Sequence, residues 1–192
     1  MYFVSKEDVQ KYPLINFNSC ISVVDNKKEV LKCCNIISQS SVVGFDTETK
    51  PAFQKGIIHD VSLLQLSVAD HVFLFRLNKI GFAQEIIDIL SNKHILKVGI
   101  DIKNDISALK RLKSFEHANF IDLNTLAISN GFKSIGAVKL SIMLLGYRIS
   151  KKQRLSDWSS EILTDSQINY AAIDAWICPK LLAVFKSRSL YP

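Results

Sequence analysis

The stretch "SVVGFDTE" (residues 41–48) joins a short apolar run to two acidic residues. The run is β-branched, which is typical of a buried central β-strand. Side chains at positions i and i+2 of a strand point to the same face of the sheet. Asp46 and Glu48 are therefore expected to project together from the end of this strand.

Patterns of apolar residues predict further strands and helices around this run. The predicted strands are residues 21–24, 61–70, 71–77, 94–100 and 119–123, and the predicted helices are residues 27–39, 82–91, 105–113, 134–146 and 165–177. A tight Ala69–Asp70–His71 turn between two of these strands favours an antiparallel hairpin. A hairpin followed by alternating helices and strands predicts an α/β fold, in which helices flank a mixed central β-sheet.

Two of the predicted helices carry further signals. Thr164 and Gln167 stand at capping-box spacing and predict where the last helix begins. Pro179 is expected to end or kink that helix, because its nitrogen cannot donate to the carbonyl of Ala175. The apolar face predicted for the helix over 27–39 consists of Val30, Leu31, Cys34, Ile36 and Ile37.

The composition is that of an ordinary globular protein, with 48% hydrophobic and 22% charged residues in a chain of 192. This length and the absence of repeats or linkers predict a single domain over residues 1–192. The net charge of +6 leans mildly toward an anionic partner.

The cysteines and the amino terminus bear on the cellular compartment. Four cysteines without a C-x-x-C pair and four scattered histidines do not match a zinc site, and reduced thiols are typical of intracellular proteins. No secretory signal and no run of ~20 apolar residues is visible, so we expect a soluble intracellular protein, cytoplasmic if it is bacterial, without a membrane span.

Two further segments carry acidic residues that could join the pair on the strand. Tyr170 and Asp174 are spaced i and i+4, which places them on one face of a helix, and small alanines around them allow that helix to approach the sheet. In "VGIDIKNDISALK" (residues 98–110), either Asp101 or Asp105 could face the same crevice, while the other caps the following helix. Taken singly, each carboxylate is better explained by solvation or capping than by a functional site.

Gathering these carboxylates would need a physical reason, because clustered acids repel one another and resist ionising together. Divalent cations supply one, since Mg²⁺ and Mn²⁺ prefer oxygen ligands and accept a phosphate as well. Two such ions about 3.5–4 Å apart can activate a water and stabilise the leaving oxygen in phosphodiester cleavage.

Three motifs occur in a fixed order: "FDTET" (residues 45–49), "VGIDIKND" (residues 98–105) and "YAAIDA" (residues 170–175). In order and spacing they resemble the three exonuclease motifs of the DEDDy 3′–5′ exonucleases, which have a ribonuclease H-like fold. The flanks "TKPAFQKG" and "QRLSDWSSEILTDSQINYAAIDA" are most similar to the ribonuclease D and Werner-syndrome exonuclease branch. The resemblance extends over about residues 20–187.

The resemblance implies roles for individual residues. The implied metal ligands are Asp46, Glu48, Asp105 and Asp174, and the implied catalytic set adds Tyr170, the tyrosine that names the subclass. Asp105 matches because it stands six residues after Gly99, whereas Asp101 falls where the family needs no acid.

The resemblance also implies a two-metal reaction that needs no covalent intermediate and uses two Mg²⁺ or Mn²⁺ ions. One ion, held by Asp46, Glu48 and Asp174, would bind the attacking water, which Tyr170 orients. The other ion, shared by Asp46 and supported by Asp105, would stabilise the departing 3′-oxygen. Nucleoside 5′-monophosphates would leave a nucleic acid that has a free 3′ end, single-stranded or recessed.

Several residues near the motifs are candidate substrate contacts: Thr47, Lys50, Phe53, Lys152, Arg154 and Trp158. The basic loop from Arg148 to Arg154 either contacts phosphates or is simply solvated. Trp158 either stacks on a base or packs under that loop. The resemblance suggests a backbone contact of Thr47 with the terminal nucleotide, and Phe53 is a candidate wedge beside the terminal base.

Two other functions fit part of the pattern. A nucleic-acid-binding module of the same fold could have lost catalysis, but all four acids and the tyrosine are present. A phosphatase with an aspartyl nucleophile would need a second Asp at position 48 and gives Asp174 no role. DNA and RNA stay open as substrates, because both present the same scissile group.

Overall fold

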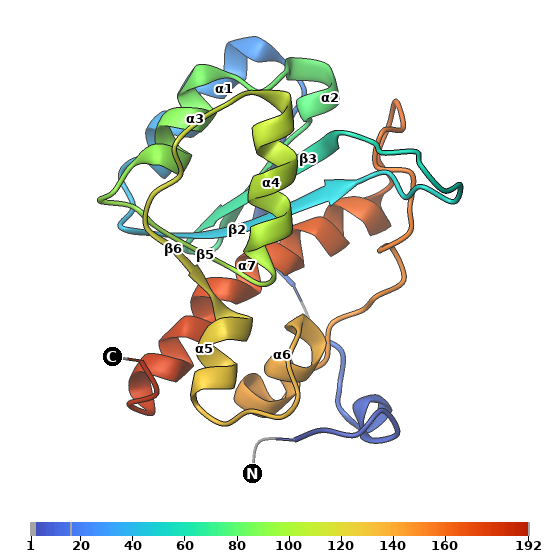
Figure 1. Ribbon diagram of the computed structural model, residues 1–192, viewed down its shortest axis with the longest axis vertical. Helices are drawn as coiled ribbons and strands as arrows, with labels where there is room; N and C mark the ends of the chain where they lie inside the picture. Colours follow the sequence, from blue (N-terminus) through green and yellow to red (C-terminus); the bar gives the residue numbers. More distant parts are fainter. Residues whose placement is uncertain (1–2, 16, 192) are drawn as a thin grey trace.

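The computed structural model describes residues 3–15 and 17–191, and a six-stranded mixed sheet forms its centre (Figure 1). The strands are β1 (Cys20–Val24), β2 (Val42–Thr49), β3 (Val61–Val68), β4 (His71–Phe75), β5 (Leu96–Gly99) and β6 (Phe120–Asp122). Their order across the sheet is β1-β4-β3-β2-β5-β6, with β3 antiparallel to both β2 and β4 and the other pairs parallel. The predicted hairpin and mixed sheet are therefore confirmed.

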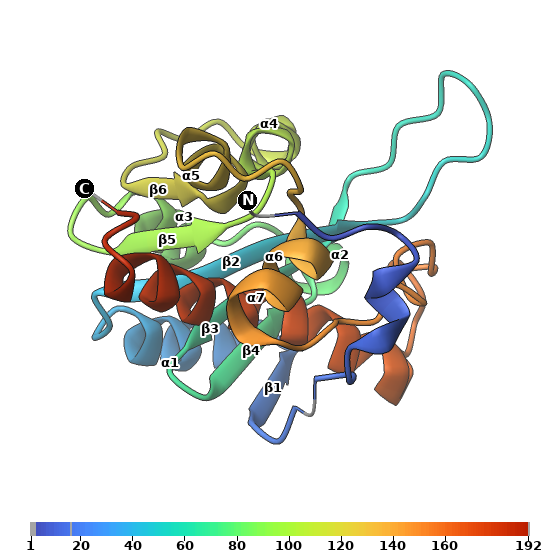
Figure 2. The same ribbon diagram turned by 90° about the horizontal axis from the view of Figure 1, so that it is seen from below.

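Helices cover both faces of this sheet. They are α1 (Lys27–Ile37), α2 (Leu77–Ile80), α3 (Gln84–Ser91), α4 (Ile102–Leu112), α5 (Leu123–Ser129), α6 (Ala137–Leu145) and α7 (Asp165–Ser187), preceded by a 3₁₀ helix, η1 (Asp8–Lys11). The helices α1, α3 and α4 share one apolar core with β2 and β3. On the opposite face α7 packs with α5 and α6 and also crosses β3 and β4 (Figure 2).

Helix α7 continues through Pro179, so of the two outcomes expected there, an end of the helix is wrong and a kink stays a prediction. The carbonyl of Ala175, which loses its intrahelical donor at the proline, accepts a hydrogen bond of 3.1 Å from Ser67 Oγ on β3. The predicted capping box of Thr164 and Gln167 is present at its amino end. Although α7 is long and apolar enough to span a membrane, its buried residues pack on the sheet, as in a core helix.

Three other local predictions need correction. Leu31 and Ile36 are exposed on α1, whose buried face includes Cys33 instead. Helix α4 begins at Ile102 rather than at residue 105. Helix α5 follows β6 directly and was not predicted.

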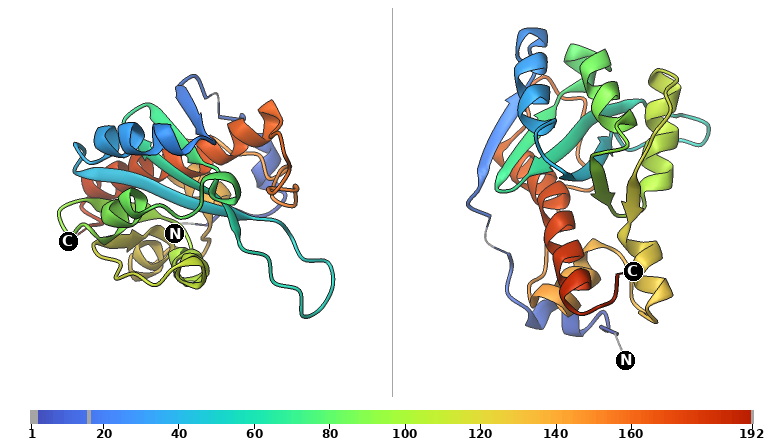
Figure 3. Two further views of the ribbon diagram at one scale, coloured as in Figure 1. Left: turned by 90° about the horizontal axis from the view of Figure 1, so that it is seen from above. Right: turned by 90° about the vertical axis from the view of Figure 1, so that its left-hand side faces the viewer.

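The connection between β2 and β3, residues 50–60, projects away from the rest of the molecule (Figures 2 and 3). It carries exposed apolar side chains, of which Phe53 is 82% and Ile58 74% exposed. The end of β2 from which this loop leaves is also where the acidic residues gather.

Candidate functional site

Three carboxylates meet where the end of β2 faces α7. Ligand oxygens of Asp46, Glu48 and Asp174 all lie within 4.8 Å of one another. Asp46 and Glu48 come from the same strand at i and i+2, and Asp174 comes from the third motif. The structure thus brings together the first and third motifs as the sequence predicts.

The close approach of α7 to β2 depends on small residues. Ala171, Ala172 and Ala175 are fully buried in the helix face that meets the sheet. On the strand, Gly44 leaves room for the helix, because a Cβ there would lie 2.1 Å from the Ala175 carbonyl oxygen. This contact, one residue along from Asp174, fixes how far the Asp174 carboxylate stands from the strand.

Asp105 lies beside the cluster in the first turn of α4. Its Oδ1 accepts a hydrogen bond of 2.6 Å from Thr47 Oγ1, which ties the second motif to the first. Asp101 is exposed, has a φ of 63° and makes no capping bond to the helix that it precedes. The choice of Asp105 over Asp101 therefore agrees with the geometry, although Asp105 stands outside the group of three.

Asp122 holds α4 in place and was missed by the sequence analysis. Its Oδ2 accepts from the backbone nitrogen of Ile102 at 2.9 Å, and its Oδ1 accepts from that of Asn124 at 2.8 Å. One carboxylate at the end of β6 thus caps both α4 and α5. The signal was its position near the end of the predicted strand over residues 119–123, just before a residue run that forms a helix.

Burial shifts the acids of the site toward their protonated forms. Burial, followed by repulsion from Asp174 and Asp105, raises the pKa of Glu48 to about 9, against a smaller lowering by Arg154. Burial raises the pKa of Asp105 and of Asp174 to about 7, and Asp46 is raised well above its usual range by burial and by its acidic neighbours. Raised pKa values of this kind mean that the nearby positive charge is too small to stabilise the ionised carboxylates.

Tyr170 stands on the same helical face as Asp174. Burial, followed by the nearby carboxylates of Asp174 and Glu48, raises the pKa of its hydroxyl above the usual range, so it remains protonated. The tyrosine ring packs against Trp158 with 5.9 Å between centroids. Trp158 is fully buried, so a base cannot reach its ring, and packing rather than base stacking explains this tryptophan.

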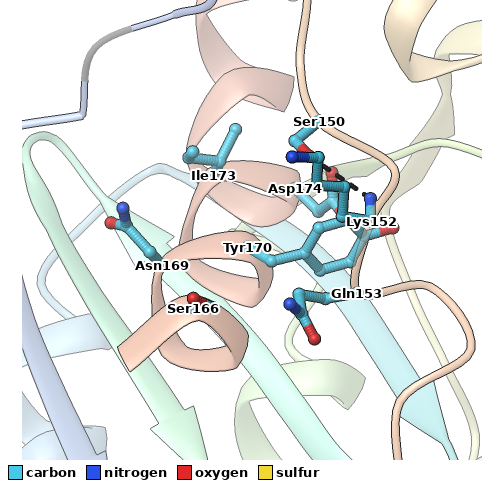
Figure 4. Close-up of a pocket in the computed structure, with 8 residues that line it drawn as sticks. All are labelled: Ser150, Lys152, Gln153, Ser166, Asn169, Tyr170, Ile173 and Asp174. Atoms are coloured by element: carbon cyan, nitrogen blue, oxygen red, sulfur yellow. Dashed lines mark hydrogen bonds between the residues drawn. The ribbon is translucent and has the colours of Figure 1, made fainter. Parts of the chain in front are cut away.

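Two small cavities open around these residues. One of about 220 Å³ contains the acidic cluster and is bordered by Thr47, Lys151 and Arg154. The other, of about 190 Å³, lies on the far side of Tyr170 and is bordered by Lys152, Gln153 and Asn169 (Figure 4). Figure 4 shows Tyr170 and Asp174 on α7 beside the loop that carries Lys152.

The candidate substrate contacts therefore divide into two groups. Thr47, Lys152 and Arg154 line the cavities of the site. Lys50 forms an exposed ion pair of 2.7 Å with Asp157, and Phe53 lies on the projecting loop, and neither borders the two cavities.

Comparisons with known proteins agree with this geometry. A family model described as 3′–5′ exonuclease matches residues 21–188. The mouse bifunctional 3′–5′ exonuclease/ATP-dependent helicase WRN is 32% identical over 149 residues, which are 73% of this chain and 10% of that protein. Ribonuclease D of Haemophilus influenzae is 30% identical over 160 residues, 80% of this chain and 38% of that protein. This chain thus spans well under half the length of both relatives.

A solved structure supplies the fold comparison. The EXO domain of Aedes aegypti Nibbler superposes with a TM-score of 0.80 at 21% sequence identity, and the match covers 91% of each chain. The fold of the present chain is therefore that of the ribonuclease H-like exonuclease domains, as predicted. With three acidic motifs in place inside the matched region, the chain belongs to the 3′–5′ exonuclease family and is of the DEDDy type.

Proposed function

We propose that this chain is a metal-dependent 3′–5′ exonuclease that hydrolyses the terminal phosphodiester of DNA or RNA and releases nucleoside 5′-monophosphates. The observation that carries the proposal is the group of three carboxylates whose oxygens lie within 4.8 Å of one another. Membership of the family supports the reaction class, and the acids support the need for metal.

The donor set fits hard divalent cations. All ligands are carboxylate oxygens, which Mg²⁺ and Mn²⁺ prefer. Among the described residues, no lysine, arginine or histidine forms an ion pair with Asp46, Glu48 or Asp174. We assign these three to one cation, and Asp46 together with Asp105 to a second. When bound, the cations supply the charge that activates a water and stabilises the leaving oxygen.

The chain's own side chains then position the reactants. The Tyr170 hydroxyl, protonated and beside Asp174, is placed to orient a water by hydrogen bonding. Thr47 fixes Asp105 through its hydroxyl. Lys151 and Arg154 border the same cavity, where their charges favour the scissile phosphate.

An inactive nucleic-acid-binding module is the alternative, and an activity assay separates the two. Matched DNA and RNA strands, single-stranded or with recessed 3′ ends, carry a 5′ label and are incubated with Mg²⁺, Mn²⁺ or EDTA. We expect stepwise shortening from the 3′ end that requires metal. Absence of metal-dependent shortening on every strand would favour the binding module, and the preferred strand identifies the substrate.

A further inference from the structure

A third and larger cavity, of about 720 Å³, adjoins the acidic site between the amino-terminal segment, α6 and the basic loop. Five of its lining residues are cationic, namely Lys6, Lys139, Arg148, Lys151 and Lys152, and none of its lining residues is acidic. We call this cavity the basic groove.

One wall of the basic groove is the amino-terminal segment, residues 3–15, which runs beside α6 (Figure 2). Backbone hydrogen bonds of 2.9 Å join Ile15 to Arg148 and Arg148 to Pro13, and Arg148 Nε donates to the Tyr12 carbonyl at 2.9 Å. Val4 is buried in the apolar core formed with α5, α6 and α7. The wall is therefore attached along its length, and it lies before residue 21, where the match to the family model begins.

The basic groove is continuous with the acidic site. Both cavities are lined by Val138, Ile149, Ser150 and Lys151. Lys151 stands where they meet, and its charge is near enough to lower the pKa of Asp174 against the larger effect of burial. A chain bound along the groove would reach the carboxylates without crossing a barrier of other elements.

Among the residues that the structure describes, no acidic side chain pairs with a cation of the basic groove. The ion pairs among the described residues are Lys11–Asp8, Lys50–Asp157, Lys79–Glu161 and Lys180–Asp70, and none involves a groove residue. Lys11, on the same segment but outside the groove, pairs with Asp8 at 2.6 Å. Five unneutralised cations around one cavity repel one another, so the groove favours an occupant with several negative charges.

We propose that the basic groove binds backbone phosphates of the strand upstream of the terminal nucleotide, with Lys6 and Lys139 as contacts. The proposal rests on the exonuclease function and assigns the amino-terminal segment to the substrate-binding surface. One released nucleotide carries a single phosphate, which is too few for five cations. The chain that remains attached to the scissile bond presents one further phosphate per nucleotide.

The test measures binding without turnover, in EDTA, by fluorescence anisotropy of a labelled dinucleotide and a labelled decanucleotide. In an Asp46→Asn background, Lys6→Gln/Lys139→Gln is compared with Lys11→Gln/Lys28→Gln, which removes the same charge outside the groove. We expect the groove variant to bind the decanucleotide about tenfold more weakly and to lower the salt slope by about 1.4, at about 0.7 per phosphate contact. In the groove variant, the decanucleotide should therefore gain less affinity over the dinucleotide than it does in the parent protein. The control variant should show the same gain as the parent protein.

The results separate this proposal from the exonuclease function. If the groove variant binds the decanucleotide as tightly as the control does, the groove assignment is overturned, even where the wild-type chain hydrolyses strands. If hydrolysis fails but the affinity loss is specific to the groove variant, the groove assignment stands and the catalytic one falls. The single change Lys6→Gln, at an exposed position, provides a smaller loss in the same direction should the double variant unfold.

Discussion

The chain contains two kinds of carboxylate, and their surroundings differ in one respect. Asp157, on the surface, lies 2.7 Å from Lys50, and hydrogen bonds to Lys50 and Ser159 lower its pKa to about 2. Glu48, in the acidic cluster, has no such ion pair with any residue that the structure describes, and burial with its acidic neighbours raises its pKa to about 9. Among the described residues, four acids, Asp8, Asp70, Asp157 and Glu161, pair with lysines of the chain, whereas the cluster has no such partner and, in our proposal, binds cations instead.

The largest effect should come from removing one acid of the cluster. Asp46→Asn takes away the carboxylate that we assign to both cations, so kcat should fall by about 10³-fold or more. Steady-state release of nucleotides in Mn²⁺ measures this loss. The matched control is Asp70→Asn, which removes a surface carboxylate paired with Lys180 and should leave kcat unchanged.

A smaller loss is expected from Tyr170→Phe. Without the hydroxyl the water is less well oriented, so kcat should fall by about 10- to 100-fold, while metal affinity survives. Calorimetric titration with Mn²⁺ run beside the rate measurement distinguishes the roles. Loss of metal binding in this variant would show that the hydroxyl supports the cations and would remove the role assigned to it here.

The contact that sets the position of Asp174 can be perturbed from the strand side. In Gly44→Ala the new Cβ would start 2.1 Å from the Ala175 carbonyl oxygen, so α7 must shift. We expect a loss of about 1–3 kcal/mol in the free energy of unfolding and a lower kcat. Gly56→Ala, in the projecting loop, is the control for activity only: no atom lies within 4 Å of the added Cβ, but the φ of 87° strains an alanine there and lowers stability as well. Equal stability and activity of Gly44→Ala and wild type would refute the close packing.

The smallest expected effect is the change in stability of the metal-free protein with pH. The raised pKa values of Glu48, Asp105 and Asp174 mean that the folded, metal-free protein binds protons more tightly than the unfolded chain does. The stabilisation of the folded state by this tighter proton binding is present below about pH 4 and is lost as the pH rises through about 7 to 9. In EDTA, the Tm should fall by about 5 °C across that window, whereas paired acids such as Asp157 lose stability only on acidification. A Tm in EDTA that is flat or rises from pH 5 to 9 would contradict the protonated cluster.

Local patterns in the sequence predicted those features whose causes are local. Strand alternation placed Asp46 and Glu48 on one face, and the capping box at Thr164 marked the start of α7. The helix does not end at Pro179, because Ser67 from a distant strand satisfies the freed carbonyl. That compensation depends on tertiary packing and leaves no signal near the proline.

The surface that we propose for the substrate was only partly predictable for the same reason. The loop around Lys152 is basic by composition, and in the structure Lys152 borders the cavity beside Tyr170. Lys6 and Arg148 line one groove although they are far apart in the sequence, and backbone pairing of the amino-terminal segment brings them together. Conversely, Trp158 carried a plausible local signal for base stacking, but its burial is a tertiary property.

A calorimetric titration of Mn²⁺ at pH 7, repeated in buffers of different ionisation enthalpy, tests most directly whether the acidic cluster is a metal site. Because burial raises the pKa of Asp105 and Asp174 to about 7 and that of Glu48 to about 9, bound cations must displace protons from the cluster. We predict Mn²⁺ binding accompanied by proton release in the wild-type chain, and much weaker binding in Asp46→Asn. Binding that is absent, or that is unchanged by Asp46→Asn and releases no protons, would contradict the account.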